Sequence, residues 1–218
     1  MAEAYTSAVK RLADLPEVFS GTDLTVKFKW TSGTASSYLA QWKKSGLVKS
    51  LGGRSDVHMN LVVNRMPNTD MALRYCYPRA VRIGLDVLRQ AGWMTQIPTR
   101  VDVAISKAAH LYDIQGYNLS PRTEKWFEIT GQGTNRSDDG IDSLRPAWTL
   151  ADMIARAGDQ RVRDAWLPDP EDLDEDIVLS DPELPIALKA FGLDPIESYE
   201  NVYQEWAGPK FQRSREVG

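Results

Sequence analysis

Apolar side chains recur with a helical period in the first part of the chain, and proline and serine mark where helices should stop and start. The pattern predicts a short helix over about 6–15 that ends at Pro16. Residues 20–23, Ser-Gly-Thr-Asp, supply N-cap side chains for a second short helix that reaches about Lys29. Two short helices in succession are therefore expected before the next turn.

A third helix is expected over 32–45. Ala35, Leu39 and Trp42 fall at i, i+4 and i+7, which places them on one buried face. Gly46 follows at the position where helices commonly end.

Two segments after this helix, 47–49 and 58–62, have the spacing of strands, and the glycine-containing stretch 51–56 joins them. Helix, turn, helix and hairpin in this order predict a winged helix-turn-helix, a module that fits the major groove of DNA. The alternative is that the same elements form only a scaffold of three helices and a hairpin.

Charge is distributed unevenly along the chain. Residues 1–65 contain nine lysines and arginines against five acidic residues, a net charge of +4, whereas the remainder carries −8 and the whole chain −4. A locally basic surface is what contact with DNA phosphates requires. The charge distribution therefore favours the DNA-binding interpretation.

The face of the third helix opposite its apolar residues is polar. Serine, threonine and glutamine side chains can read base edges, and lysine adds attraction to phosphates of any sequence. For double-stranded DNA we predict base contacts from Ser32, Thr34, Ser37, Tyr38 and Gln41, and contacts nearer the phosphates from Lys43, Lys44 and Arg54.

The segment 64–70 is polar and interrupted by Pro67, so it is the predicted linker. The sequence thus predicts an α+β chain of two domains, a winged helix-turn-helix DNA-binding domain at 1–65 and a mixed helix and sheet domain at 70–208.

In the second domain the apolar spacing predicts a helix over 77–92 and strands over 100–105, 117–119 and 125–130. A further helix is expected to begin at Pro146.

Several short motifs stand in this domain: Tyr77-Pro78 at a helix start, Ala91-Gly92-Trp93, Thr95-Gln96-Ile97-Pro98 followed by Val101-Asp102-Val103, and Pro146-Ala147-Trp148-Thr149-Leu150-Ala151-Asp152. Together they resemble the antitoxin family of the AbiE type IV toxin–antitoxin systems, over about residues 10–155. The last motif resembles that family's Pro-x-Arg-Thr-Leu-x-Asp helix start. Because Trp148 stands where a basic residue is usual, Thr149 and Asp152 are the matched positions.

The resemblance implies a bacterial antitoxin whose N-terminal domain represses its own operon by binding inverted repeats, an arrangement compatible with a homodimer on DNA. It implies that the C-terminal domain counteracts a nucleotidyltransferase-like toxin without needing a stable complex. The residues alone allow a simpler interpretation of Thr149 and Asp152, since a hydroxyl and a carboxylate at this spacing can cap a helix N-terminus.

Two other functions are open at this point: a transcription regulator whose second domain senses a ligand, and a nuclease that carries a DNA-binding module. A metal-dependent nuclease of the common type needs an acidic residue on one strand and a Glu-x-Lys triplet on the next. Asp102 and Glu128 lie on expected strands, but Ile129-Thr130 follows Glu128 and supplies no lysine. We therefore expect no catalytic residues, no metal ion and no cofactor.

The segment 169–200 carries 11 acidic residues and one base, Lys189, with apolar residues between them that predict folding. Tyr199, Tyr203 and Trp206 fall at helical spacing and predict a final helix that docks by one face. The sequence has no apolar run of about 18 residues and no basic-then-apolar signal region, so we expect a cytoplasmic protein without a membrane partner.

Overall fold

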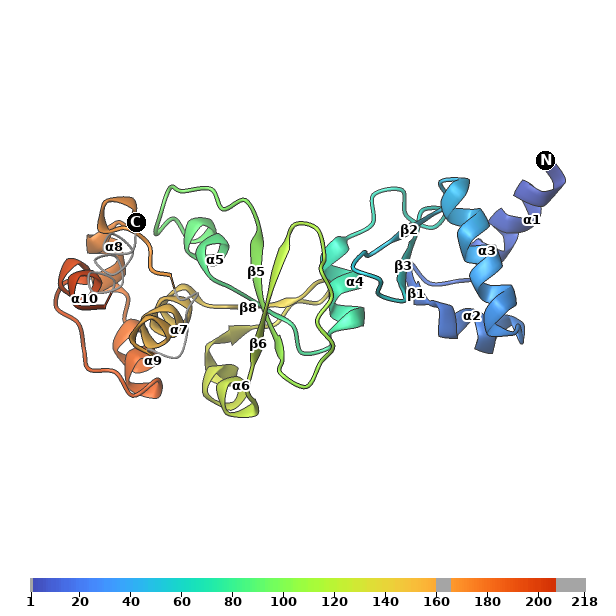
Figure 1. The fold of residues 1–218 in the computed structure, drawn as a ribbon. Helices are drawn as coiled ribbons and strands as arrows, with labels where there is room; N and C mark the ends of the chain where they lie inside the picture. The colour runs from blue at the N-terminus through green and yellow to red at the C-terminus, as the bar shows by residue number, and fades with distance from the viewer. Residues whose placement is uncertain (1, 160–165, 207–218) are drawn as a thin grey trace, which may run out of the picture. The chain divides into compact units, whose positions relative to one another are not determined.

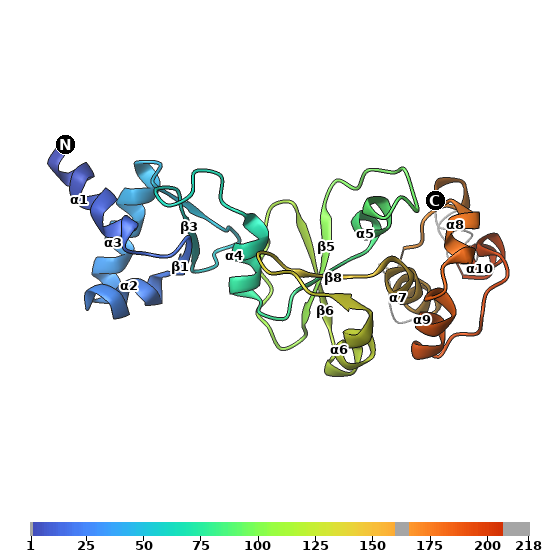
Figure 2. The ribbon, with the colours of Figure 1, turned by 180° about the vertical axis from the view of Figure 1, so that it is seen from behind.

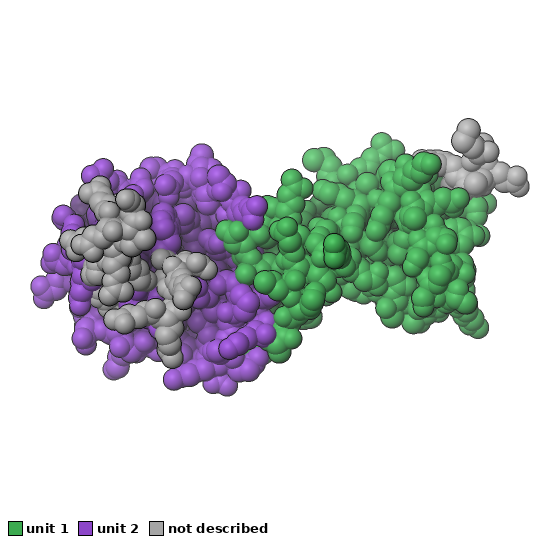
Figure 3. Space-filling model, in the orientation of Figure 1, with its two compact units in different colours: residues 1–80, 108–119, 137–141 green, residues 81–107, 120–136, 142–218 purple. Residues whose placement is uncertain are grey.

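The computed structural model describes residues 2–159 and 166–206 of the chain (Figure 1). Its helices and strands form a mixed α+β protein, so this part of the fold prediction is confirmed. The chain divides into two compact units (Figure 3). The first unit contains Met1–Ala80, Ala108–Leu119 and Ser137–Ile141, and the second contains Val81–Lys107, Ser120–Arg136 and Asp142–Gly218.

The first unit is built from four helices and three strands of the described chain. In chain order these are α1 Ala2–Ala13, β1 Val18–Ser20, α2 Gly21–Phe28, α3 Ser32–Lys44, β2 Val48–Ser50, β3 Val57–Asn60 and α4 Thr69–Cys76. Helix α4 lies on the other side of the sheet from α2 and α3, as Figures 1 and 2 both show.

The three strands form an antiparallel sheet in the order β1-β3-β2. Val18 pairs with Met59, and Lys49 pairs with the same residue from the other side. Strands β2 and β3 lie at nearly the positions predicted from the sequence. Strand β1 was not predicted, because it is three residues long and pairs only with residues about forty positions later in the chain.

The polar segment predicted as a linker is part of the first unit. The side chain of Asn68 accepts a hydrogen bond from the backbone N–H of Asp70 at 2.9 Å and so caps α4. The Asn68 amide also donates to the carbonyl of Asp139 at 2.9 Å, and Arg74 of α4 donates to the carbonyl of Ser137 at 2.6 Å. The first unit therefore does not end at residue 65, because α4 and segments from much later in the chain complete it.

The second unit contains a five-stranded sheet with helices around it. Its elements are β4 Val81–Ile83, α5 Leu85–Gln90, β5 Val101–Ser106, β6 Tyr117–Arg122, α6 Glu124–Thr130, the 3-10 turn η1 Gly131–Gly133, β7 Thr134–Asn135, β8 Asp142–Leu144, α7 Pro146–Gly158, the 3-10 turn η2 Pro170–Asp172, α8 Glu175–Ser180, α9 Leu184–Ala190 and α10 Tyr199–Trp206. The first three residues of β6 fall within the first unit. The strand order is β6-β5-β4-β8-β7, and β4 and β8 run parallel.

Helix α7 forms the centre of the second unit. Its eight consecutive residues from Ala147 to Ile154 are all buried, although a helix on a protein surface would expose one face. Trp148 is the largest of them, and it occupies the space beside Gly133, where an added Cβ atom would clash with its ring.

Two predictions in this unit are wrong. The stretch expected as one helix over 77–92 contains β4 and α5, which are separated at Gly84, where φ is +76°. Val81 and Leu88 still pack in one core, which explains the helix-like spacing. The stretch 125–130 is helix α6 instead of a strand, because Thr123 caps it and Trp126 begins its buried face.

Candidate nucleic-acid interface

Helix α3 carries most of the predicted DNA contacts, and a local hydrogen bond fixes its start. The side chain of Thr31 accepts a hydrogen bond from the backbone N–H of Thr34 at 3.2 Å. Ala35, Leu39 and Trp42 are buried, so the helix and its predicted apolar face are confirmed.

The structure brings seven of the eight predicted contact residues together on α3. The exposed ones are Ser32, Ser37, Gln41, Lys43 and Lys44, and the half-buried ones are Thr34 and Tyr38. Arg54 is exposed on the connection between β2 and β3.

The polar side chains on α3 differ in how free they are to bind a ligand. The Ser37 hydroxyl donates to the carbonyl of Gly33 at 2.9 Å, and the hydroxyls of Thr31 and Thr34 share a hydrogen bond of 2.9 Å. Within the described residues the Gln41 side-chain amide makes no hydrogen bond. Gln41 therefore keeps all its donors and acceptors for a base edge.

Tyr38 belongs to a group of packed rings, which we call the aromatic stack: Phe28, Trp30, Tyr38 and Trp42. The rings of Trp30 and Tyr38 lie 4.4 Å apart at 15°, and those of Phe28 and Trp30 lie 4.7 Å apart at 28°. Such offset stacking stabilises a fold beyond the area it buries. The Tyr38 ring therefore contributes to packing, and its predicted base contact stays a prediction.

The connection between β2 and β3 is tightly constrained. Gly53 has φ +60°, and a Cβ atom there would lie 2.7 Å from the carbonyl oxygen of Asp113. The next residue, Arg54, also has a positive φ, of 66°. The segment that covers this glycine is itself fixed, since the Tyr77 hydroxyl donates to the carbonyl of His110 at 2.9 Å. Arg54 therefore lies on a loop whose conformation is constrained by packing.

A carboxylate from this connection reaches the start of α2. Asp56 accepts a hydrogen bond from the backbone N–H of Gly21 at 3.0 Å, and its other oxygen lies 3.5 Å from Nε2 of His58. Burial and the nearby Lys43 ammonium lower the pKa of His58 from 6.5 to about 4, although Asp56 opposes this shift. His58 is therefore neutral at pH 7, and its contact with Asp56 is not an ion pair.

The second unit contains a buried polar network around Asp152. Arg122 donates from Nη2 to Asp152 Oδ2 at 2.8 Å, and Trp126 donates from Nε1 to Asp152 Oδ1 at 2.7 Å. Arg122 also donates from Nη1 to the Ser120 hydroxyl at 2.7 Å. The network joins the end of β6, helix α6 and helix α7 in the interior.

Thr149 and Asp152 do not cap α7, so the capping interpretation is wrong. The N-cap position is Arg145, and both residues lie within the helix and are buried. The Thr149 hydroxyl has no hydrogen-bond partner among the described residues.

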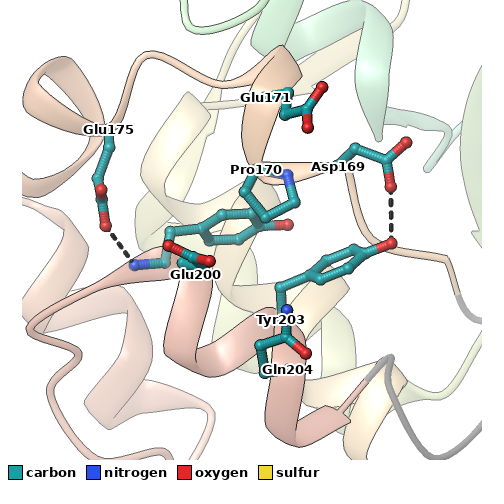
Figure 4. A pocket seen from close by; sticks show the side chains of 8 residues that line it. Asp169, Pro170, Glu171, Glu175, Glu200, Tyr203 and Gln204 are labelled. Carbon is teal, nitrogen blue, oxygen red and sulfur yellow. Dashed lines mark hydrogen bonds between the residues drawn. The ribbon is translucent and has the colours of Figure 1, made fainter.

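Four carboxylates from the acidic segment surround a hollow of about 530 Å³ in the second unit (Figure 4). They belong to Asp169, Glu171, Glu175 and Glu200, and the rest of the lining is Pro170, Tyr199, Tyr203 and Gln204. The Tyr203 hydroxyl donates to Asp169 at 2.6 Å (Figure 4). Small-molecule sites are lined mostly by apolar groups, so this hollow does not favour a ligand-sensing function.

The predicted docking of the final helix is confirmed for its first tyrosine. Tyr199 is buried and its hydroxyl donates to the carbonyl of Pro168 at 2.7 Å, while Tyr203 is half-buried. The side chain of Trp206 lies outside the described part of the structure.

The arrangement required for the nuclease alternative is not found. Asp102 lies on β5, but Glu128 lies on helix α6 instead of the neighbouring strand. Among the residues that the structure describes, no three histidine, cysteine or acidic side chains are grouped so that they could hold a metal ion. None of the described helices is long and apolar enough to cross a membrane.

Comparison with known proteins gives a likeness of fold. No family model and no curated protein matches the sequence. The chain is similar in structure to the RV2827C protein from Mycobacterium tuberculosis, with a TM-score of 0.50 and 14% sequence identity, over 94% of this chain and 80% of that one. At this identity the likeness concerns the α+β fold alone.

Proposed function

We propose that this protein is a winged-helix DNA-binding repressor of its own operon and an antitoxin of the AbiE type. The observation that carries the DNA-binding part is the order α1-β1-α2-α3-β2-β3 combined with the sheet order β1-β3-β2. In helix-turn-helix proteins the second helix of the pair enters the major groove, and here that helix is α3. The β2–β3 connection then forms the wing.

The surface of α3 supports this assignment. One face is buried, and the exposed residues outside it include Gln41, Lys43 and Lys44. The net charge of +4 in residues 1–65 matches what a phosphate-binding surface needs.

The antitoxin part rests on the motifs of the second unit. Thr149 and Asp152, the matched positions, are buried in α7 and cannot touch a toxin from there. We therefore propose that these residues maintain the fold and that exposed residues of the second unit counteract the toxin.

Replacing Gln41 with alanine is expected to reduce discrimination between DNA sequences by roughly 1–3 kcal/mol, because a bidentate base contact would be lost. Replacing Lys44 with alanine is expected to lower the affinity for all duplexes to the same extent and to lower the salt dependence of binding. Fluorescence anisotropy with a duplex from upstream of the gene and a scrambled duplex, at several salt concentrations, measures both effects.

Lys189→Ala, an exposed substitution in the second unit, is the matched control and should bind DNA like the parent. If Gln41→Ala and Lys44→Ala also bind both duplexes like the parent, α3 does not enter the groove.

The antitoxin part is tested with a full-length variant in which Gln41, Lys43 and Lys44 are all replaced by alanine. With the nucleotidyltransferase-like toxin expressed from an unrelated promoter, this variant is expected to restore growth although it no longer binds DNA. Growth restored only by DNA-binding forms would instead favour a transcription regulator.

A further inference from the structure

The aromatic stack extends beyond α2 and α3 to an arginine of α1. The guanidinium carbon of Arg11 lies 4.9 Å from the centroid of the Tyr38 ring and 5.6 Å from that of Trp30. Tyr38 follows Ser37 directly in α3 and is one helical turn from Gln41. The Arg11 guanidinium therefore lies at the border of the polar face of α3 that is proposed to enter the groove.

The charge of Arg11 is not neutralised within the described part of the chain, where no carboxylate pairs with it. Its side chain is half-buried. A guanidinium that stacks through its face keeps its N–H donors at the edge, where they match a phosphate in a bidentate manner. The stack also restricts the rotamers of a long side chain before any ligand binds, which reduces the entropy lost on binding.

We propose that Arg11 binds a DNA phosphate beside α3 and that Tyr38 and Trp30 form the platform that orients its guanidinium. The proposal rests on the proposed DNA-binding function and adds to it a contact from α1. It also gives Tyr38 a new role, because the ring supports a phosphate contact.

The experiment compares full-length variants in binding to two duplexes, one from upstream of the gene and one of random sequence. Arg11→Gln removes the charge and is expected to lower the affinity for both duplexes about eightfold at 0.1 M salt. It should also reduce the magnitude of the slope of log K against log salt by about 0.9. Arg11→Lys keeps the charge but cannot stack through a flat face, so it should weaken both duplexes with a nearly unchanged slope.

Lys10→Gln is the matched control, since it removes one exposed charge from the adjacent position of the same helix. It should change the slope less than Arg11→Gln does. Equal slopes for Arg11→Gln and the parent would overturn the proposal, as would an equal loss in Lys10→Gln. An Arg11→Lys variant with full affinity would show that the platform has no role.

Circular dichroism and thermal unfolding show whether each variant folds. If Arg11→Gln fails to fold, the proposal is tested with Arg11→Lys and with Tyr38→Leu, a substitution that removes the platform but keeps the charge. Each of these variants must then lower the affinity for both duplexes to the same extent. A parent protein that binds neither duplex would refute the proposed function itself. A parent and a Lys44→Ala variant that behave as expected, together with an unaffected Arg11→Gln, would refute only this inference.

Discussion

Replacing Asp152 with alanine is expected to destabilise the second unit by about 3–5 kcal/mol, because it leaves a buried charge without its partner. The Arg122 and Asp152 side chains are only 6% and 4% exposed. Without the carboxylate, Arg122 loses its ion pair and Trp126 loses the acceptor for its indole N–H. Hydrogen exchange of the α7 amides, monitored at increasing urea concentration, measures the stability of this unit separately.

An exposed ion pair in the same unit provides the control. Arg136 lies 3.4 Å from Asp142, and its side chain is 86% exposed. Arg136→Ala should cost less than about 1 kcal/mol, because water screens the pair. Similar small losses in both variants would mean that the Asp152 network does not stabilise the interior.

The second expected result concerns acid. Protonation of His58 should make the stability of the first unit fall by about 3 kcal/mol between pH 6.5 and pH 4, where 1.36 kcal/mol corresponds to each unit of pKa shift. The pKa of His58 is about 4 in the folded protein and 6.5 ordinarily, so in this range only the unfolded chain takes up the proton. The stabilisation is complete above pH 6.5 and is lost as the pH falls towards 4.

Urea unfolding at a series of pH values, compared between the parent and His58→Gln, isolates this contribution from that of the carboxylates. The difference between the two proteins should change only between pH 6.5 and 4. His110→Gln, which replaces an exposed histidine, should follow the parent throughout. Parallel curves for the parent and His58→Gln would contradict the prediction.

Local sequence signals predicted the elements that depend on neighbouring residues. Helix α3 has a cap at Thr31 and an apolar face at helical spacing, both of which lie within the helix or next to it. Strand β1 could not be found in this way, because three residues become a strand only when β3 pairs with them.

In the candidate site, too, features that depend on neighbouring residues were predictable and features that depend on distant residues were not. The exposed positions on α3 followed from periodicity, whereas the stacking of Arg11 on Tyr38 depends on how α1 packs against α3. The domain boundary was misplaced for a related reason, since the partners of Asn68 and Arg74 lie more than sixty residues later.

The order in which the chain builds its two units restricts how such a protein can change in evolution. The chain passes from one unit to the other at residues 80–81, 107–108, 119–120, 136–137 and 141–142. Proteins with a single linker can acquire a new specificity by recombination, which joins a foreign DNA-binding domain to an existing partner domain. Here a crossover at any one of these positions would divide at least one of the two units. If the proposed DNA-binding function holds, new sequence specificity is therefore expected to arise by point substitutions on α3, within an otherwise intact chain.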